Sequence, residues 1–180
     1  MDKVISQLDK DILVLIRNNV SAFLTEMAGK YDRDGLEVLD IAPEVHEGTK
    51  FYFKKADVKT LDIDPQYNTD YMCDLCTNNE NIIPNGSFDI CVCTEVLEHV
   101  SNPFSAVKEI KRILKGGGIA LISTPFNFRI HGPLPDCWRF TIHGLKELFK
   151  DFEILDLREL EADNRFLMPY HYVLEAKKCY

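Results

Sequence analysis

Four short apolar runs, separated by segments long enough to form helices, constrain the fold of this 180-residue chain more than any other feature. They span residues 37–42, 58–63, 88–94 and 119–123. Short β-prone runs of this kind are typical of strands buried on both faces. Because parallel strands need crossover connections, which are usually helices, the pattern predicts an open α/β sheet with helices on both faces.

Helices are predicted from the period of the apolar residues. Between Val4 and Met27 they recur every three or four positions, which predicts an N-terminal helix that is ended by Gly29 and the polar stretch after it. A second helix is expected to begin at Pro103 and to be stopped by Gly116-Gly117-Gly118. A third, shorter helix is expected over residues 141–149.

The remaining strands complete the predicted sheet. Residues 71–73 form a short strand, and residues 152–157 and 170–176 form an antiparallel pair at the edge. The result is a doubly wound, mostly parallel seven-stranded sheet. No repeat or Ser/Gly-rich linker interrupts the chain, so we expect one domain over residues 31–180, with residues 1–30 as a helix packed on it.

Composition limits the partners and the location. The chain has 21 Lys and Arg against 29 Asp and Glu, a net charge of −8, which disfavours nucleic acid as a partner. The first residues lack the basic and apolar parts of a signal peptide, and no apolar run is long enough to span a membrane. We therefore expect a cytoplasmic protein without membrane insertion, whose six cysteines are reduced thiols.

Acidic residues follow three of the predicted strands at their carboxyl ends. They are Asp40, Asp62 and Asp74. In a parallel sheet these ends share one edge, where such folds bind their ligands. A carboxylate at the end of the second strand can accept hydrogen bonds from both hydroxyls of a ribose. A purely structural role is the alternative for Asp40 and Asp64, since an Asp after a strand can cap the next helix.

Several motifs occur together, in order, between about residues 36 and 125. They are Val38-Leu39-Asp40-Ile41, Asp62-Ile63-Asp64-Pro65, Cys73-Asp74-Leu75, the segment 88–100 and Ile113-Leu114-Lys115-Gly116-Gly117-Gly118. This combination resembles the class I S-adenosylmethionine-dependent methyltransferases. The resemblance implies a Rossmann-like sheet, S-adenosyl-L-methionine as the cofactor and methyl transfer as the reaction.

The resemblance also implies a role for each residue of a cofactor site. Asp62 would hold the ribose, Asp74 the adenine amino group, and Asp40 the ammonium of the cofactor. Thr94 and Glu95 would lie beside the sulfonium. A carboxylate-rich edge suits a cofactor that carries two positive groups. The complete predicted set is Asp40, Ala42, Asp62, Asp64, Asp74, Thr94 and Glu95.

One departure from the family pattern matters for activity. The family has a glycine-rich turn after the first strand, but this chain reads Asp40-Ile41-Ala42-Pro43, with Gly48 as the next glycine. A non-catalytic module that binds S-adenosylmethionine or a nucleoside is therefore an alternative function. A nicotinamide-dependent oxidoreductase is less favoured, because no Gly-X-Gly-X-X-Gly follows the first strand.

The segment 127–141 concentrates side chains suited to chemistry. We expect His131 or Asp136 to accept a proton from the methyl acceptor. The segment 127–141 resembles one that small stand-alone methyltransferases place over the acceptor pocket. In the structural alternative, Asp136 pairs with Arg139 and Trp138 fills the core.

His99 is a third candidate proton acceptor, with a buried or helix-terminal structural histidine as its alternative. No metal site is predicted. Cys73 and Cys76 have the spacing of zinc ligands, but Cys91 and Cys93 lie in a strand expected to be central, where thiols pack as small apolar groups.

The acceptor is not encoded in a shared motif, because methyl transfer from a sulfonium needs alignment more than a fixed catalytic group. We expect a small molecule, or a glycan or lipid precursor. Part of the apolar face of the first helix is a candidate homodimer contact.

Overall fold

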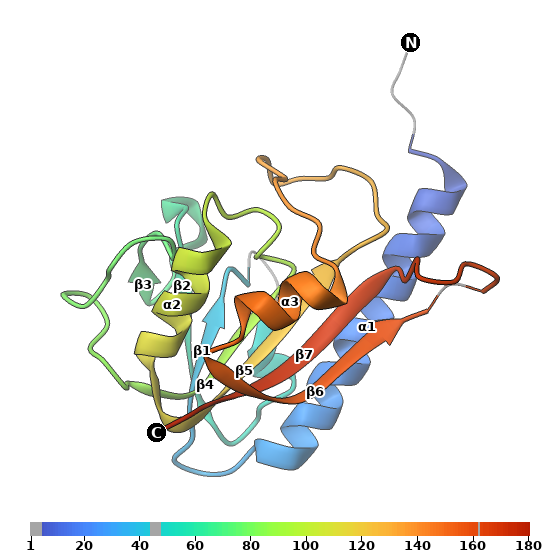
Figure 1. Cartoon of the computed structure of the whole chain (residues 1–180). Coiled ribbons are helices and arrows are strands. Elements are labelled where there is room, and N and C mark those ends of the chain that lie inside the picture. Colours follow the sequence, from blue (N-terminus) through green and yellow to red (C-terminus); the bar gives the residue numbers. More distant parts are fainter. Residues whose placement is uncertain (1–4, 44–47, 162) are drawn as a thin grey trace.

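The computed structural model describes residues 5–43, 48–161 and 163–180. It contains a seven-stranded sheet in the order β3-β2-β1-β4-β5-β7-β6, in which β7 runs antiparallel to both of its neighbours (Figure 1). The predicted mostly parallel sheet with an antiparallel pair at one edge is thus confirmed. The strands are β1 (Glu37–Ile41), β2 (Asp57–Asp62), β3 (Tyr71–Met72), β4 (Phe88–Thr94), β5 (Leu114–Pro125), β6 (Phe152–Leu160) and β7 (His171–Lys178).

Helices cover both faces of this sheet, as α1 (Gln7–Tyr31) on one face and α2 (Pro103–Ile113) with α3 (Ile142–Leu148) on the other (Figure 1). The buried residues accordingly form two clusters. Val38 of β1 packs in the cluster that contains Phe23 of α1, whereas its neighbour Leu39 packs with Ile110 of α2. This alternation follows from the two-residue period of a strand, and it explains why the central strands are apolar throughout.

The first helix ends in the polar stretch after Gly29, as predicted: its last residue is Tyr31, and Asp32 is the C-cap. The two residues after Gly29 contact the sheet. Lys30 Nζ donates to Glu175 of β7 over 2.7 Å, and the Tyr31 hydroxyl donates to the same carboxylate. These contacts with the sheet outweigh the weak helix propensity of glycine.

The second helix begins at Pro103, as predicted, and Asn102 caps it by accepting the Ser105 N–H over 3.1 Å. The helix ends at Ile113, and the three glycines that follow lie within β5. The prediction that Gly116-Gly117-Gly118 form the stop and turn is therefore wrong. They lie where the β4–β5 register shifts, and Gly117 has a φ of +78° there.

The apolar stripe of α1 is buried in only part of its length. Ile12 and Ile16 are buried, but Leu8 and Leu15 are 65% and 45% exposed, and Ile5, just before the helix, is 48% exposed. The N-terminal turns of α1 extend past the end of the sheet, so no strand covers them (Figure 1). Val4 lies outside the described residues. No helix in the described ranges combines the length and hydropathy needed to cross a bilayer.

Candidate functional site

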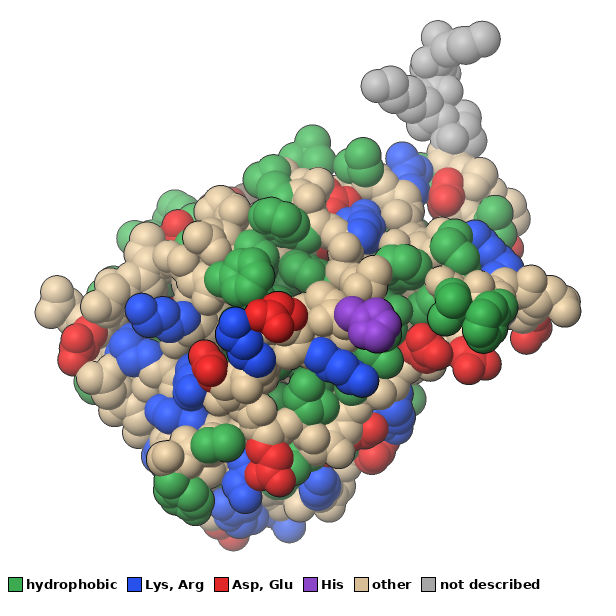
Figure 2. Space-filling view, in the orientation of Figure 1, with side chains coloured by type: hydrophobic (Ala, Val, Ile, Leu, Met, Phe, Trp, Pro, Cys, Tyr) green, Lys and Arg blue, Asp and Glu red, His purple; other side chains and the backbone are tan. Residues whose placement is uncertain are grey.

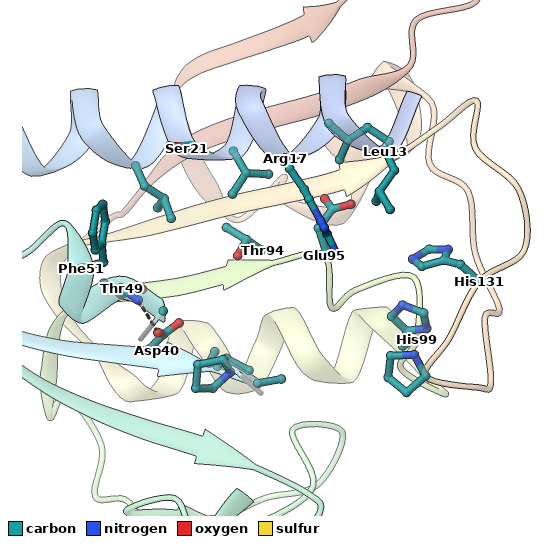
Figure 3. Close-up of a pocket in the computed structure, with 18 of the residues that line it drawn as sticks. Leu13, Arg17, Ser21, Asp40, Thr49, Phe51, Thr94, Glu95, His99 and His131 are labelled. Carbon is teal, nitrogen blue, oxygen red and sulfur yellow. Dashed lines mark hydrogen bonds between the residues drawn. The ribbon is translucent and has the colours of Figure 1, made fainter. Parts of the chain in front are cut away.

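A cavity of about 590 Å³ opens at the carboxyl ends of β1 and β4 (Figure 3). Parallel sheets bind their ligands at this edge. The segment 128–133 closes one end of the cavity, and α1 forms a wall that the sequence did not predict, with Arg17 and Ser21 facing inward (Figure 3). The polar and charged lining residues are Arg17, Ser21, Asp40, Thr49, Tyr52, Thr94, Glu95, His99 and His131.

Asp40 is the buried acid of the cavity. Its side chain lies at the end of β1, the residue is 4% exposed, and Oδ2 accepts the Thr49 N–H over 2.7 Å. Burial raises the pKa of Asp40 to about 6, and the hydrogen bond from Thr49 opposes this rise. At neutral pH the carboxylate is therefore negatively charged, although its burial disfavours the charge. A cationic group of a ligand would stabilise it.

The turn after β1 keeps a left-handed backbone without the expected glycine. Ala42 has a φ of +55°, and its N–H donates to Leu61 O over 2.7 Å. Gly48, with a φ of +53°, lies against Asp40: a Cβ there would collide with Asp40 Oδ2 and approach Pro43 Cβ to 2.9 Å. Gly48 thus packs directly against the Asp40 carboxylate, where a larger residue would not fit. Both residues line the cavity, so the acid can meet a cationic group of a ligand there.

The other predicted acids lie outside the lining of this cavity. Asp62 is 4% exposed at the end of β2, and its Oδ1 accepts the Asp64 N–H over 2.8 Å. Asp64 caps the 3₁₀ helix Pro65–Tyr67, which agrees with the capping alternative. Asp74 follows β3, and its Oδ1 accepts the Cys76 N–H over 2.8 Å. The structure therefore brings Asp40, Thr94 and Glu95 together and leaves these three acids farther along the same edge.

Glu95 is held in place at the end of β4, next to Thr94. Its φ is +55°, and its Oε1 accepts the Ser123 hydroxyl over 2.8 Å. His171 Nε2 lies 2.7 Å from the same oxygen, and His171 Nδ1 lies 2.8 Å from Asn19 Nδ2 of α1. The sequence analysis missed His171 and Asn19, because α1 and β7 are far from the motifs along the chain.

At the other end of the cavity, two histidines face a buried acid. His99 Nε2 and His131 Nε2 lie 3.7 and 3.8 Å from Glu98 Oε1. The Glu98 side chain is fully buried, and burial together with nearby Glu95 raises its pKa well above the usual range. Burial and the nearby His99 lower the pKa of His131. The sequence analysis missed Glu98, although it directly precedes His99.

The structural alternative for Asp136 agrees with its contacts. Arg139 donates to both of its oxygens, with Nη2 to Oδ2 at 2.7 Å, and this pairing lowers the pKa of Asp136 to about 2. Asp136 Oδ2 also accepts the His131 N–H over 3.0 Å. A carboxylate so held is a weak base and orients its neighbours. Trp138 is 40% exposed, so the expectation that it fills the core is wrong; its ring N–H donates to Val100 O, which holds it at the surface.

This sheet order, with its antiparallel pair at the edge and its ligand cavity at the ends of β1 and β4, defines the class I S-adenosylmethionine-dependent methyltransferases, whose cofactor is S-adenosyl-L-methionine. Residues 20–122 match the family model described as methyltransferase domain, and the chain belongs to this family.

Solved structures show the same fold at low sequence identity. One is an S-adenosylmethionine-dependent methyltransferase from Methanosarcina mazei, with a TM-score of 0.65, 19% identity, and coverage of 85% of this chain and 97% of that chain. Another is the 1,6-didemethyltoxoflavin-N1-methyltransferase of Burkholderia thailandensis with bound S-adenosylhomocysteine. It has a TM-score of 0.61, 15% identity, and coverage of 100% of this chain and 94% of that chain.

Curated relatives match shorter stretches. The ubiquinone biosynthesis O-methyltransferase of Xanthomonas oryzae is 30% identical over 86 residues, which are 48% of this chain and 32% of that protein. The enzyme of the same name from Glaesserella parasuis is 54% identical over 37 residues, 21% of this chain and 16% of that protein. The match thus spans less than a third of the length of these relatives.

Proposed function

We propose that this chain transfers the methyl group of S-adenosylmethionine to a small molecule, or to a glycan or lipid precursor. One observation carries the proposal: a single cavity joins the buried Asp40, against which Gly48 packs, to the imidazoles of His99 and His131. The bound cofactor supplies a methyl group on a sulfonium, an activated leaving group. The chain then has to align the acceptor and exclude water.

The cofactor end is argued from charge and space. Asp40 would bind the ammonium, and the left-handed turn at Ala42 brings the backbone close to the ligand. Asp62 would accept the ribose hydroxyls, and Asp74 the adenine amino group. The proposed cofactor-binding set is the predicted one: Asp40, Ala42, Asp62, Asp64, Asp74, Thr94 and Glu95.

The acceptor end is argued from the histidines. The lowered pKa of His131 favours a neutral imidazole at pH 7, which can take a proton from an acceptor hydroxyl or amine. His99 lies beside His131, with ring centroids 4.9 Å apart. Asp136 holds His131 in position by accepting its backbone N–H. The names of the curated relatives support an oxygen atom as the acceptor.

The surroundings of the cavity support an acceptor with an apolar part. Ile130 lies within the segment 128–133 and Leu134 directly follows it, and they are 71% and 75% exposed. Figure 2 shows several apolar side chains gathered along the upper edge of this face of the molecule. Arg17 projects from α1 into the cavity and can bind an anionic group on the acceptor (Figure 3). A lipid precursor with a charged group combines both features.

The test is a pair of measurements on the same variants. Wild-type protein should bind S-adenosylhomocysteine in calorimetry and should methylate at least one member of a panel of hydroxylated acceptors, detected by mass spectrometry. Asp62→Ala should lose both. Asp57→Ala is the matched control, because Asp57 lies at the opposite end of β2 and is 57% exposed. Unchanged transfer by Asp62→Ala would contradict the proposed cofactor site.

The alternative of a non-catalytic binding module is motivated by Ala42 and Pro43. It would be favoured if the wild-type protein binds S-adenosylhomocysteine but methylates no acceptor in the panel. A nicotinamide-dependent oxidoreductase is the least favoured function. It predicts that NADH fluorescence changes when the protein is titrated into NADH. A cytoplasmic location and a homodimer contact on α1 stay predictions.

A further inference from the structure

Glu98 has an unusual environment for a carboxylate. Its side chain is fully buried, and neither oxygen has a hydrogen-bond partner among the described residues. Its position is nevertheless fixed, because its backbone carbonyl accepts the N–H groups of Cys137 and Trp138 over 2.7 and 3.1 Å. A buried carboxylate without a partner is costly, so the fold would be expected to give it one.

The two side chains that face Glu98 offer lone pairs to it. His99 Nδ1 lies 2.9 Å from the carbonyl oxygen of Pro135, which can only accept, so this nitrogen carries the proton. His131 Nδ1 lies 3.2 Å from Asp136 Oδ2 and 3.3 Å from Arg129 O, which are also acceptors. Each imidazole is therefore the Nδ1–H tautomer, and both Nε2 atoms turn unprotonated toward the same carboxylate.

Two lone pairs and a buried carboxylate repel one another unless a proton or a metal cation lies between them. The gaps of 3.7 and 3.8 Å are too long for a shared proton in a hydrogen bond, so a metal ion fits better. One ligand atom from each of Glu98, His99 and His131 lies within 4.8 Å of the other two. Two ligands of a tetrahedral zinc ion are roughly 3.3 Å apart, from bond lengths of about 2.0–2.1 Å. The distances of 3.7 and 3.8 Å between the imidazoles and Glu98 exceed this by a few tenths of an ångström.

We propose that Glu98, His99 and His131 bind a divalent transition-metal ion of the zinc or iron(II) class. Two imidazoles and one carboxylate are a common donor set for these ions, and nitrogen donors disfavour Mg²⁺ and Ca²⁺. The contacts of both Nδ1 atoms strengthen the assignment, because metal-binding histidines donate their other N–H to a carbonyl or carboxylate. The Asp136–His131 contact, with Arg139 behind it, is such an arrangement.

The sequence analysis predicted no metal site, but it considered only the cysteines as ligands. The proposed site differs from that prediction. It also has access to the cavity, because His99 and His131 are among the residues that line it (Figure 3). Three protein ligands leave at least one coordination position for water or for an acceptor oxygen. An acceptor hydroxyl bound to the metal would lose its proton more easily, and it would release that proton to water, because the imidazoles would then be ligands. In the metal-bound protein this would replace proton transfer to His131. This last step rests on the proposed methyl transfer, whereas metal binding itself does not.

The test uses Zn²⁺ alone as the probe. Full-length protein is stripped with a chelator, titrated with Zn²⁺ by calorimetry, and assayed for metal content by mass spectrometry after dialysis. We expect about one equivalent of Zn²⁺ with micromolar or tighter affinity, and no heat with Mg²⁺. Glu98→Gln and His131→Gln should each weaken Zn²⁺ binding by at least about 100-fold. His143→Gln should leave it unchanged, because His143 is an exposed residue of α3.

Two further readouts keep each outcome decisive. Metal-free Glu98→Gln should melt at or above the temperature of metal-free wild type, because a neutral amide replaces the buried acid; His131→Gln tests the same site independently. Co²⁺ should give a visible spectrum without a thiolate charge-transfer band. The proposal is overturned if wild type binds no Zn²⁺, if both variants bind it as wild type does, or if Co²⁺ reports a thiolate ligand such as exposed Cys137. Titration of S-adenosylhomocysteine into metal-free protein tests the proposed function separately.

Discussion

Replacing Asp40 by Asn should make the protein more stable at neutral pH and should lower its affinity for the cofactor. The amide keeps the shape of the side chain, and its oxygen can still accept the Thr49 N–H. It removes the negative charge that burial disfavours. The same charge is the proposed partner of the cofactor ammonium, so stability and binding should change in opposite directions.

The size of the effect follows from the pKa. Burial raises the pKa of Asp40 from 3.8 to about 6. A raised acid pKa means that the folded state holds a proton longer than the unfolded state does, so stability is full below about pH 4 and falls as the pH rises through about 6. Between about pH 4.5 and about pH 7.5, wild type should lose about 2 kcal/mol through this group, and Asp40→Asn should not.

The assay is urea denaturation of both proteins at several pH values across that range. All other titrating groups are shared, so the difference in unfolding free energy between variant and wild type isolates Asp40. It should grow by about 2 kcal/mol in favour of the variant as the pH rises. Calorimetry with S-adenosylhomocysteine should show at least about 10-fold weaker binding by the variant. A difference that is constant with pH would refute the argument that burial raises this pKa.

Three other substitutions test separate parts of the account. Gly48→Ala should weaken S-adenosylhomocysteine binding at least about 10-fold in calorimetry, because the new Cβ collides with the Asp40 carboxylate and displaces it; unchanged affinity would show that the position of this carboxylate does not matter for binding. Ala42→Gly should raise the free energy of unfolding by up to about 1 kcal/mol in urea denaturation, because a φ of +55° strains alanine, and a loss of similar size would contradict this. Asp136→Asn should lower the free energy of unfolding by about 2 kcal/mol at pH 7. This loss should shrink as the pH falls toward about 2, where Asp136 loses its charge beside Arg139; a loss that stays constant with pH would contradict the ion pair.

Much of the fold could be predicted because its signals are local. The buried strands are short apolar runs, and Pro103 marks the beginning of α2 in the sequence itself. The errors arose where tertiary structure decided the outcome. Gly116-Gly117-Gly118 were expected to form a turn, but they lie within β5 at the register shift beside β4, and no local pattern predicts this pairing.

The site was predicted less completely for the same reason. Asp40 could be placed at the cavity because strand ends in a parallel sheet converge, and Glu95 because of the resemblance to the family. Glu98 stands next to His99 in the sequence, but only the packing shows that its carboxylate is fully buried and faces two imidazoles. The missing glycine at position 42 suggested a defective turn, whereas the backbone retains the left-handed conformation there.

The most direct test of the central claim is a calorimetric titration of S-adenosylhomocysteine into the wild-type chain. The account predicts saturable binding at about one site per chain, despite the turn in which alanine and proline replace glycine. No heat of binding at millimolar ligand would contradict it, and would mean that this methyltransferase fold has lost its cofactor.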